Sequence, residues 1–160
     1  MDIAGSCHCG AISFTLESHT PYPYLRCYCS ICRKTAGGGG YAINIMGEAA
    51  SFRVRGRRNL RIYRARIVED GKEKLSPARR HFCGECGSAL WVADPRWPES
   101  VYPFASAIDT PLPLPPERAH IMLDYRPAWV KAPRGSKDKC FREYPDEAII
   151  DWHRRLGLVE

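Results

Sequence analysis

The sequence predicts a mainly β fold of many short strands, with cysteine knuckles and few helices. Short apolar or alternating segments recur along its 160 residues, separated by glycine and proline turns. Seven of the eight cysteines fall in closely spaced groups. Near the C-terminus, residues 146–156 have the apolar spacing of an amphipathic helix. At this length we expect a single domain, residues 1–160.

The first predicted strand covers residues 11–17, where apolar and polar side chains alternate with a period of two. Residues 22–28 are rich in tyrosine and proline, which favours an extended segment that delivers Cys27. Residues 29–35 should form a knuckle and a short helical turn, which the glycines at 37–40 end. Further strands are expected at residues 41–46, 52–55, 60–68, 88–93, 101–108, 120–124 and 127–130.

The connecting segments complete the prediction. We expect a hairpin between 52–55 and 60–68, followed by a polar loop at 69–77. Proline-rich residues 110–116 predict a stiff connector, and 131–139 a basic loop. In the predicted C-terminal helix, Asp146 is the expected cap and Gly157 ends the helix, while three apolar residues share one face: Ile149, Trp152 and Leu156.

The composition argues against a membrane-spanning or secreted protein. Apolar residues make up 44% of the chain, yet no run is long enough to span a membrane. The first residues lack the basic and apolar regions of a signal peptide, so we expect a cytoplasmic protein with reduced thiols. The net charge of +6 comes from one stretch, residues 53–80, which carries 11 Lys/Arg and 3 Asp/Glu. This stretch is typical of a solvated basic surface, and a nucleic-acid or acidic partner is the alternative.

The cysteine spacing indicates metal binding rather than disulfides. In a reducing compartment, C-x-C and C-x-x-C pairs present two thiolates from one turn, which suits tetrahedral zinc. The pairs Cys7/Cys9 and Cys83/Cys86 would together complete a closed four-thiolate site of structural type. A zinc ribbon that joins the Cys83/Cys86 pair to Cys29 and Cys32 is the alternative.

The remaining group, Cys27, Cys29 and Cys32, would leave zinc one ligand short, as in catalytic or labile sites. A small thiol substrate could take that fourth position and lose its proton there. Cys140 could instead close this site as a second structural centre, or a cysteine could react without metal. The flanking cations Arg26, Arg33 and Lys34 could offset the thiolate charge or hold substrate carboxylates.

Three motifs resemble the glutathione-dependent formaldehyde-activating enzyme family, whose domain also occurs in centromere protein V. They are Gly5-Ser-Cys7-His-Cys9-Gly-Ala, Cys27-Tyr-Cys29-Ser-Ile-Cys32-Arg-Lys and His81-Phe-Cys83-Gly-Glu-Cys86-Gly-Ser-Ala-Leu-Trp91. The resemblance implies coiled antiparallel β-sheets with zinc knuckles, a fold shared with a Rab-binding zinc chaperone and methionine sulfoxide reductase B. It also implies structural zinc on Cys7, Cys9, Cys83 and Cys86, and catalytic-type zinc on Cys27, Cys29 and Cys32.

The activity that the resemblance implies is a carbon–sulfur lyase reaction, in which glutathione and formaldehyde form S-hydroxymethylglutathione. The developing alkoxide needs a proton, and Tyr28, Tyr41 and His120 are candidate donors by residue type. Two other classes remain: a zinc-stabilised module that binds through residues 53–80, and a chaperone-like zinc protein without catalysis. Binding through residues 53–80 should weaken with salt, whereas the enzyme should depend on a thiol.

Overall fold

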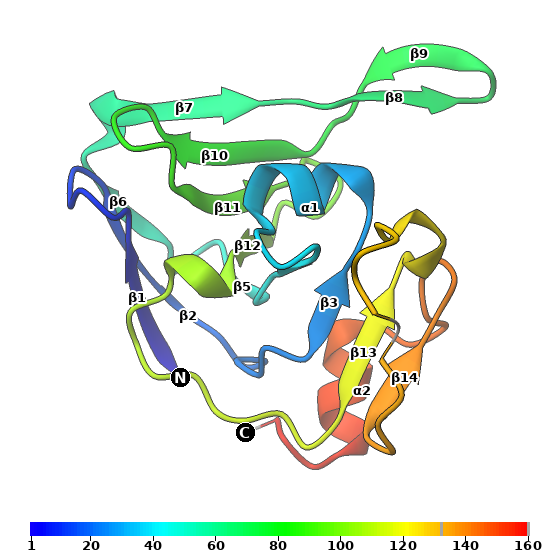
Figure 1. Cartoon of the computed structure of the whole chain (residues 1–160). Helices are drawn as coiled ribbons and strands as arrows, with labels where there is room; N and C mark the ends of the chain where they lie inside the picture. The colour runs from blue at the N-terminus through cyan, green and yellow to red at the C-terminus, as the bar shows by residue number, and fades with distance from the viewer. Residues whose placement is uncertain (132, 160) are drawn as a thin grey trace.

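The computed structural model describes residues 1–131 and 133–159, which form short β-strands in four sheets (Figure 1). The α-helices are α1 (Ser30–Ala36) and α2 (Ile149–Arg155). No described helix has the length and apolar character needed to cross a membrane. The mainly β prediction is confirmed. The strands are β1 (Asp2–Ser6), β2 (Ser13–Glu17), β3 (Leu25–Cys27), β4 (Ala42–Ile43), β5 (Gly47–Glu48), β6 (Arg53–Arg55), β7 (Leu60–Tyr63), β8 (Arg66–Glu69), β9 (Lys72–Leu75), β10 (Arg79–Cys83), β11 (Ala89–Ala93), β12 (Ser100–Pro103), β13 (Arg118–Ile121) and β14 (Asp138–Cys140).

A three-stranded antiparallel sheet in the order β1-β2-β6 forms one side of the molecule (Figure 1). The predicted alternation is confirmed in β2, where Phe14 and Leu16 are buried and their neighbours face outward. Strand β1 was not predicted from the sequence. In this strand Gly5 lies opposite Phe14, and a Cβ at Gly5 would lie 2.3 Å from that ring. The close approach of the two strands therefore requires glycine at this position.

The largest sheet has five antiparallel strands in the order β5-β12-β11-β10-β7. Trp91 of β11 packs edge to face on Phe14 of β2, with ring centroids 5.6 Å apart. The main core is therefore built from both sheets, and cysteines 7 and 83 belong to it. Its other buried members are Ile3, Ile12, Phe14, Leu16, Ile45, Leu90, Trp91, Val101 and Ala107.

A third sheet, in the order β14-β13-β3-β4, differs from the others because β13 runs parallel to both β3 and β14. It shares a smaller core with α2, in which Trp152 stacks on Tyr24 with ring centroids 3.7 Å apart. Ile149 and Leu156 pack against the same core, which confirms the predicted apolar face. The predicted cap was wrong, because Ala148 rather than Asp146 takes the N-cap position.

The predicted hairpin of residues 52–55 and 60–68 was also wrong. Strand β6 pairs with β2, whereas β7 pairs with β10, so the chain changes sheets between them. The chain passes from one sheet to the other at Gly56, whose φ is 76°. A Cβ there would lie 1.9 Å from the carbonyl oxygen of Ala11. The turn is thus pressed against another segment, a contact that local sequence does not reveal.

Residues 69–77, expected to be a loop, contain strand β9, which pairs with β8 in a separate two-stranded hairpin. Asp70 and Gly71 have φ values of 52° and 72° and form its turn. An Asp-Gly pair is a recognised hairpin signal, so this element could have been predicted. Residues 127–130 form a turn rather than the expected strand, with the Val130 N–H donating to the Pro127 carbonyl at 3.0 Å. Of the predicted loop 131–139, residue 132 lies outside the described residues and 138–139 begin β14.

Candidate metal centres

Four cysteines from two distant segments meet where β1 ends and β10 leads into β11. Their sulfur atoms all lie within 4.8 Å of one another, with Cys7–Cys9 at 3.6 Å and Cys9–Cys83 at 3.8 Å. Tetrahedral zinc bonded to sulfur at about 2.3 Å needs sulfur–sulfur distances of about 3.8 Å. The donor set therefore fits zinc, and its members are Cys7, Cys9, Cys83 and Cys86.

Two similar glycine turns create this arrangement. Gly10 has a φ of 74° and donates its N–H to the Cys7 carbonyl at 3.0 Å. Gly87 has a φ of 73° and donates to the Cys83 carbonyl at 2.9 Å. Each turn brings the two cysteines of one pair together. The Ile12 N–H also donates to the Cys7 sulfur at 3.2 Å. Knuckles of this kind hold thiolates through backbone geometry, as the spacing predicted.

The cysteines of this four-cysteine cluster differ in their exposure to solvent. Cys7 and Cys83 are buried, whereas Cys9 and Cys86 are exposed. Hydrogen bonds from the side chain and backbone of Ser88 lower the pKa of Cys86 to about 5. A lower pKa favours the thiolate, the form that binds metal. The zinc-ribbon alternative is contradicted, because Cys83 and Cys86 meet the N-terminal pair.

The other cysteine group lies at the junction of β3 and α1. The sulfur atoms of Cys27, Cys29 and Cys32 lie within 4.8 Å of one another. Cys29 is the N-cap of α1, and its sulfur accepts the Cys32 backbone N–H at 3.3 Å. Helix capping thus fixes the orientation of the middle cysteine. The three cysteines of the C-x-C-x-x-C motif therefore lie together, and their role as zinc ligands stays a prediction.

The contacts within this group shift the pKa values of two cysteines in opposite directions. Hydrogen bonds from Cys27 and Cys32 lower the pKa of Cys29, whereas contacts with Cys29 and Cys32, together with burial, raise the pKa of Cys27. A metal cation would replace the protons of the thiols that it binds, because thiolates are the ligating form.

Among the described residues, no fourth Cys, His, Asp or Glu ligand atom joins this group. Cys140 lies on β14, is exposed, and its thiol donates to the Pro133 carbonyl at 3.8 Å. The alternative in which Cys140 closes the site is therefore not supported. The arrangement instead fits a metal with an open fourth position.

Two of the candidate proton donors lie in a buried chain beside the three cysteines. The Tyr28 hydroxyl lies 2.9 Å from Nδ1 of His120, whose Nε2 lies 2.9 Å from Asp138. Arg118 also donates to Asp138 at 2.9 Å. Hydrogen bonds from His120 and Arg118 lower the pKa of Asp138 to about 2. Burial lowers the pKa of His120, which favours the neutral ring.

The charged groups around the three cysteines include an arginine outside the predicted set. Arg26 lies over the Tyr41 ring, 4.9 Å from its centroid, on the side that β-strand alternation turns away from Cys27. The guanidinium that contacts the cluster belongs to Arg80 of β10, whose Nη2 lies 3.9 Å from the Cys32 sulfur. Arg80 could not be recognised from the sequence, because its contact with Cys32 of α1 depends on tertiary packing.

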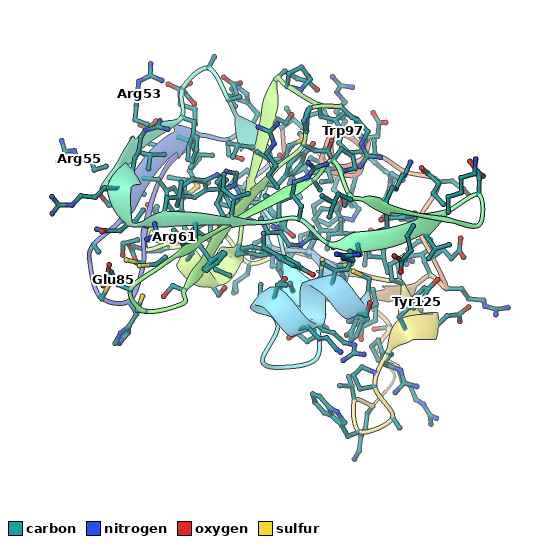
Figure 2. The ribbon with its side chains drawn as sticks, turned by 90° about the horizontal axis from the view of Figure 1, so that it is seen from above. Arg53, Arg55, Arg61, Glu85, Trp97 and Tyr125 are labelled. Atoms are coloured by element: carbon teal, nitrogen blue, oxygen red, sulfur yellow. The ribbon has the colours of Figure 1, made fainter. Side chains whose placement is uncertain are left out.

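The basic stretch 53–80 is divided among several sheets. Its strands belong to three separate sheets, and Arg80 turns inward. Figure 2 shows Arg53 and Arg55 pointing away from the body of the protein. Arg66 pairs with Glu73, and Arg64 donates to the Ser76 carbonyl. This division of charge favours a solvated basic surface over a dedicated binding face.

A mainly β framework with two cysteine clusters defines a small β protein with two candidate zinc centres. A sequence model of the family "Glutathione-dependent formaldehyde-activating enzyme" matches residues 2–124. A protein of Halomonas elongata, provisionally named as such an enzyme, is 59% identical over 160 residues, which cover 100% of this chain and 99% of the relative. The chain belongs to the glutathione-dependent formaldehyde-activating enzyme family.

One solved structure is also similar, a crystal structure of a Rhodobacter sphaeroides protein. It shares 27% sequence identity with this chain, and the TM-score is 0.51. The match covers 69% of this chain and 91% of that protein. The likeness supports the arrangement of strands described above.

Proposed function

We propose that this protein is a zinc-dependent carbon–sulfur lyase-type enzyme that acts on a thiol adduct. Glutathione and formaldehyde are the proposed reactants, and S-hydroxymethylglutathione is the product. Family membership and the name of the Halomonas elongata relative support this choice of substrates. The observation that carries the proposal is the three-sulfur group of Cys27, Cys29 and Cys32, which leaves a metal one position for a substrate.

The two clusters have different roles in this proposal. Cys7, Cys9, Cys83 and Cys86 hold a structural zinc that joins the N-terminal turn to the β10–β11 turn. Cys27, Cys29 and Cys32 hold the second zinc. When bound, that zinc supplies a Lewis acid that favours the thiolate form of the substrate. The cap of α1 would hold Cys29 in the orientation needed to bind that zinc.

The proposed reaction is an addition. The substrate sulfur forms a bond to the carbonyl carbon of formaldehyde, the C=O π electrons move to oxygen, and that oxygen takes a proton. Tyr28 and His120 are buried and hydrogen-bonded to each other, so we assign them a positioning role beneath the cysteine turn. Because His120 is also hydrogen-bonded to Asp138, this series of hydrogen bonds holds Tyr28 in place between Cys27 and Cys29.

The test is the exchange rate between formaldehyde and glutathione, measured by NMR with zinc-loaded protein. The native protein should accelerate exchange over the spontaneous reaction, and Cys29→Ala should not. Zinc analysis of the variant provides the control, since it should retain the zinc of the four-cysteine cluster. Equal rates with native protein, variant and buffer would exclude this reaction.

A further inference from the structure

Arg80 is placed beside the three-cysteine group by the alternation of β10. It lies opposite Val92 of β11, and Val92 packs against the apolar cluster that contains Cys32. The neighbouring Arg79 and His81 face the other side, where His81 stacks on Trp91. The side chain of Arg80 therefore lies on the same face as Val92, and its Nη2 approaches the Cys32 sulfur at 3.9 Å.

The hydrogen bonding of Arg80 is incomplete within the described part of the chain. Its Nε and Nη1 atoms are buried and have no acceptor there. Asp94 lies close enough for its pKa to respond to Arg80, but both carboxylate oxygens of Asp94 already accept from Arg96, at 3.0 and 2.7 Å. A buried cation with unused donors is costly unless a nearby negative charge compensates it.

We propose that Arg80 is the counter-charge of the three-cysteine site and increases its affinity for zinc and for an anionic fourth ligand. This inference rests on the proposed function. Three thiolates on one zinc ion leave a net charge of −1, and a bound substrate thiolate makes it −2. Arg80 offsets one of these charges where the surrounding dielectric is low.

The four-cysteine cluster shows why this compensation belongs to one site. With four thiolates it would carry the same charge of −2, yet two of its cysteines are exposed to water. The groups that contact its sulfur atoms include neutral donors, among them the Ile12 N–H and the Ser88 hydroxyl. Water stabilises the charge of that cluster, whereas the more buried three-cysteine site uses a guanidinium.

The consequence is selectivity for the fourth ligand. A cation beside the site stabilises an anionic ligand more than a neutral one, so a thiolate is favoured over water. Arg80 would thus bias the site toward substrate thiols without contacting the rest of the substrate. Lysine would retain the charge but not the planar guanidinium donors.

The experiment compares zinc-loaded wild-type protein with Arg80→Gln and Arg80→Lys. Arg79→Gln is the matched control, because Arg79 is the adjacent arginine, exposed, on the opposite face of β10. Zinc transfer to a chromophoric chelator is measured for both zinc ions. Hydrogen bonds to charged groups are worth enough to change affinity by about 10-fold or more. Arg80→Gln should lower the affinity for one zinc ion by that factor and leave the affinity for the other unchanged. Arg80→Lys should have an intermediate effect.

Calorimetric titration with glutathione provides the second measurement, and Arg80→Gln should lower glutathione affinity at least about 10-fold. Unchanged zinc transfer and unchanged glutathione affinity in Arg80→Gln would overturn the role of Arg80 and leave the proposed function intact. Wild-type protein that holds two zinc ions but binds no glutathione would overturn the proposed function. The zinc-transfer difference would then still decide the role of Arg80. Wild-type protein that holds one zinc ion would overturn both.

Discussion

The hydroxyl of Tyr28 lies 2.9 Å from Nδ1 of His120, and both residues are almost fully buried. Asp138 accepts from Nε2 of the same ring, so Nδ1 of the neutral histidine is left to accept the Tyr28 proton. The hydrogen bonds thus link Asp138 of β14 and His120 of β13 to Tyr28, the residue between Cys27 and Cys29. They therefore couple the parallel strands β13 and β14 to the three-cysteine site.

Tyr28→Phe should destabilise the protein by about 1–3 kcal/mol, because it leaves a buried acceptor on His120 without a partner. Urea unfolding measures the change. Tyr41→Phe is the matched control, because within the described residues the Tyr41 hydroxyl makes no hydrogen bond, although its ring packs against Tyr28. An equal decrease in the free energy of unfolding of the two variants would show that the Tyr28–His120 hydrogen bond does not stabilise the fold.

Cys83→Ala and Cys29→Ala should separate the two clusters by their effect on stability. Cys83 is fully buried and joins two distant segments, so its loss should cost at least about 4 kcal/mol, as expected when a structural metal is lost. Cys29→Ala should remain folded and retain one zinc ion per chain. Elemental zinc analysis and denaturant unfolding test both expectations. Similar unfolding of the two variants would instead indicate two structural sites.

The cysteine clusters could be predicted from sequence because knuckle geometry is local. C-x-C and C-x-x-C turns with glycines place two sulfur atoms together whatever the rest of the fold does. The pairing of Cys7 and Cys9 with Cys83 and Cys86 also agrees with the structure. Arg80 could not be found in this way. Its approach to Cys32 depends on the pairing of β10 with β11 and on the packing of α1.

The strand pairings show the same limit. The alternation in β2 was recognised, because half-burial leaves a period of two in the sequence. The partner of β7 was not, because Gly56 moves the chain from one sheet to another. That residues 1–160 form a single domain stays a prediction, as does the fold likeness to the Rab-binding zinc chaperone and methionine sulfoxide reductase B.

Gly56→Ala should be more destabilising than Gly71→Ala, although both glycines have positive φ values, of 76° and 72°. An alanine in this backbone region costs roughly 1–2 kcal/mol at either position. At Gly56 the new Cβ would also meet the Ala11 carbonyl oxygen at 1.9 Å, whereas nothing lies within 4 Å at Gly71. The backbone must shift at Gly56, which adds about 1–3 kcal/mol. Thermal or urea unfolding of the two variants measures the difference, and equal losses would contradict the close approach.

His153 should make stability depend on pH. It belongs to α2 and is fully buried, its Nδ1 lies 2.8 Å from the Ile149 carbonyl, and burial lowers its pKa. The unfolded chain then binds a proton at higher pH than the folded one, so this contribution is present above about pH 6.5 and is lost as the pH falls below it.

The measurement is the free energy of unfolding of wild-type protein and His153→Gln between pH 8 and pH 5.5, values chosen to lie on both sides of the unfolded histidine pKa of about 6.5. The variant should lose less stability than wild-type protein over this range. The zinc clusters, and the buried His81 and His120, are common to both proteins, so the difference between the curves isolates His153. Parallel curves would mean that His153 has the same proton affinity in the folded and unfolded chain, which would contradict its burial as a neutral ring.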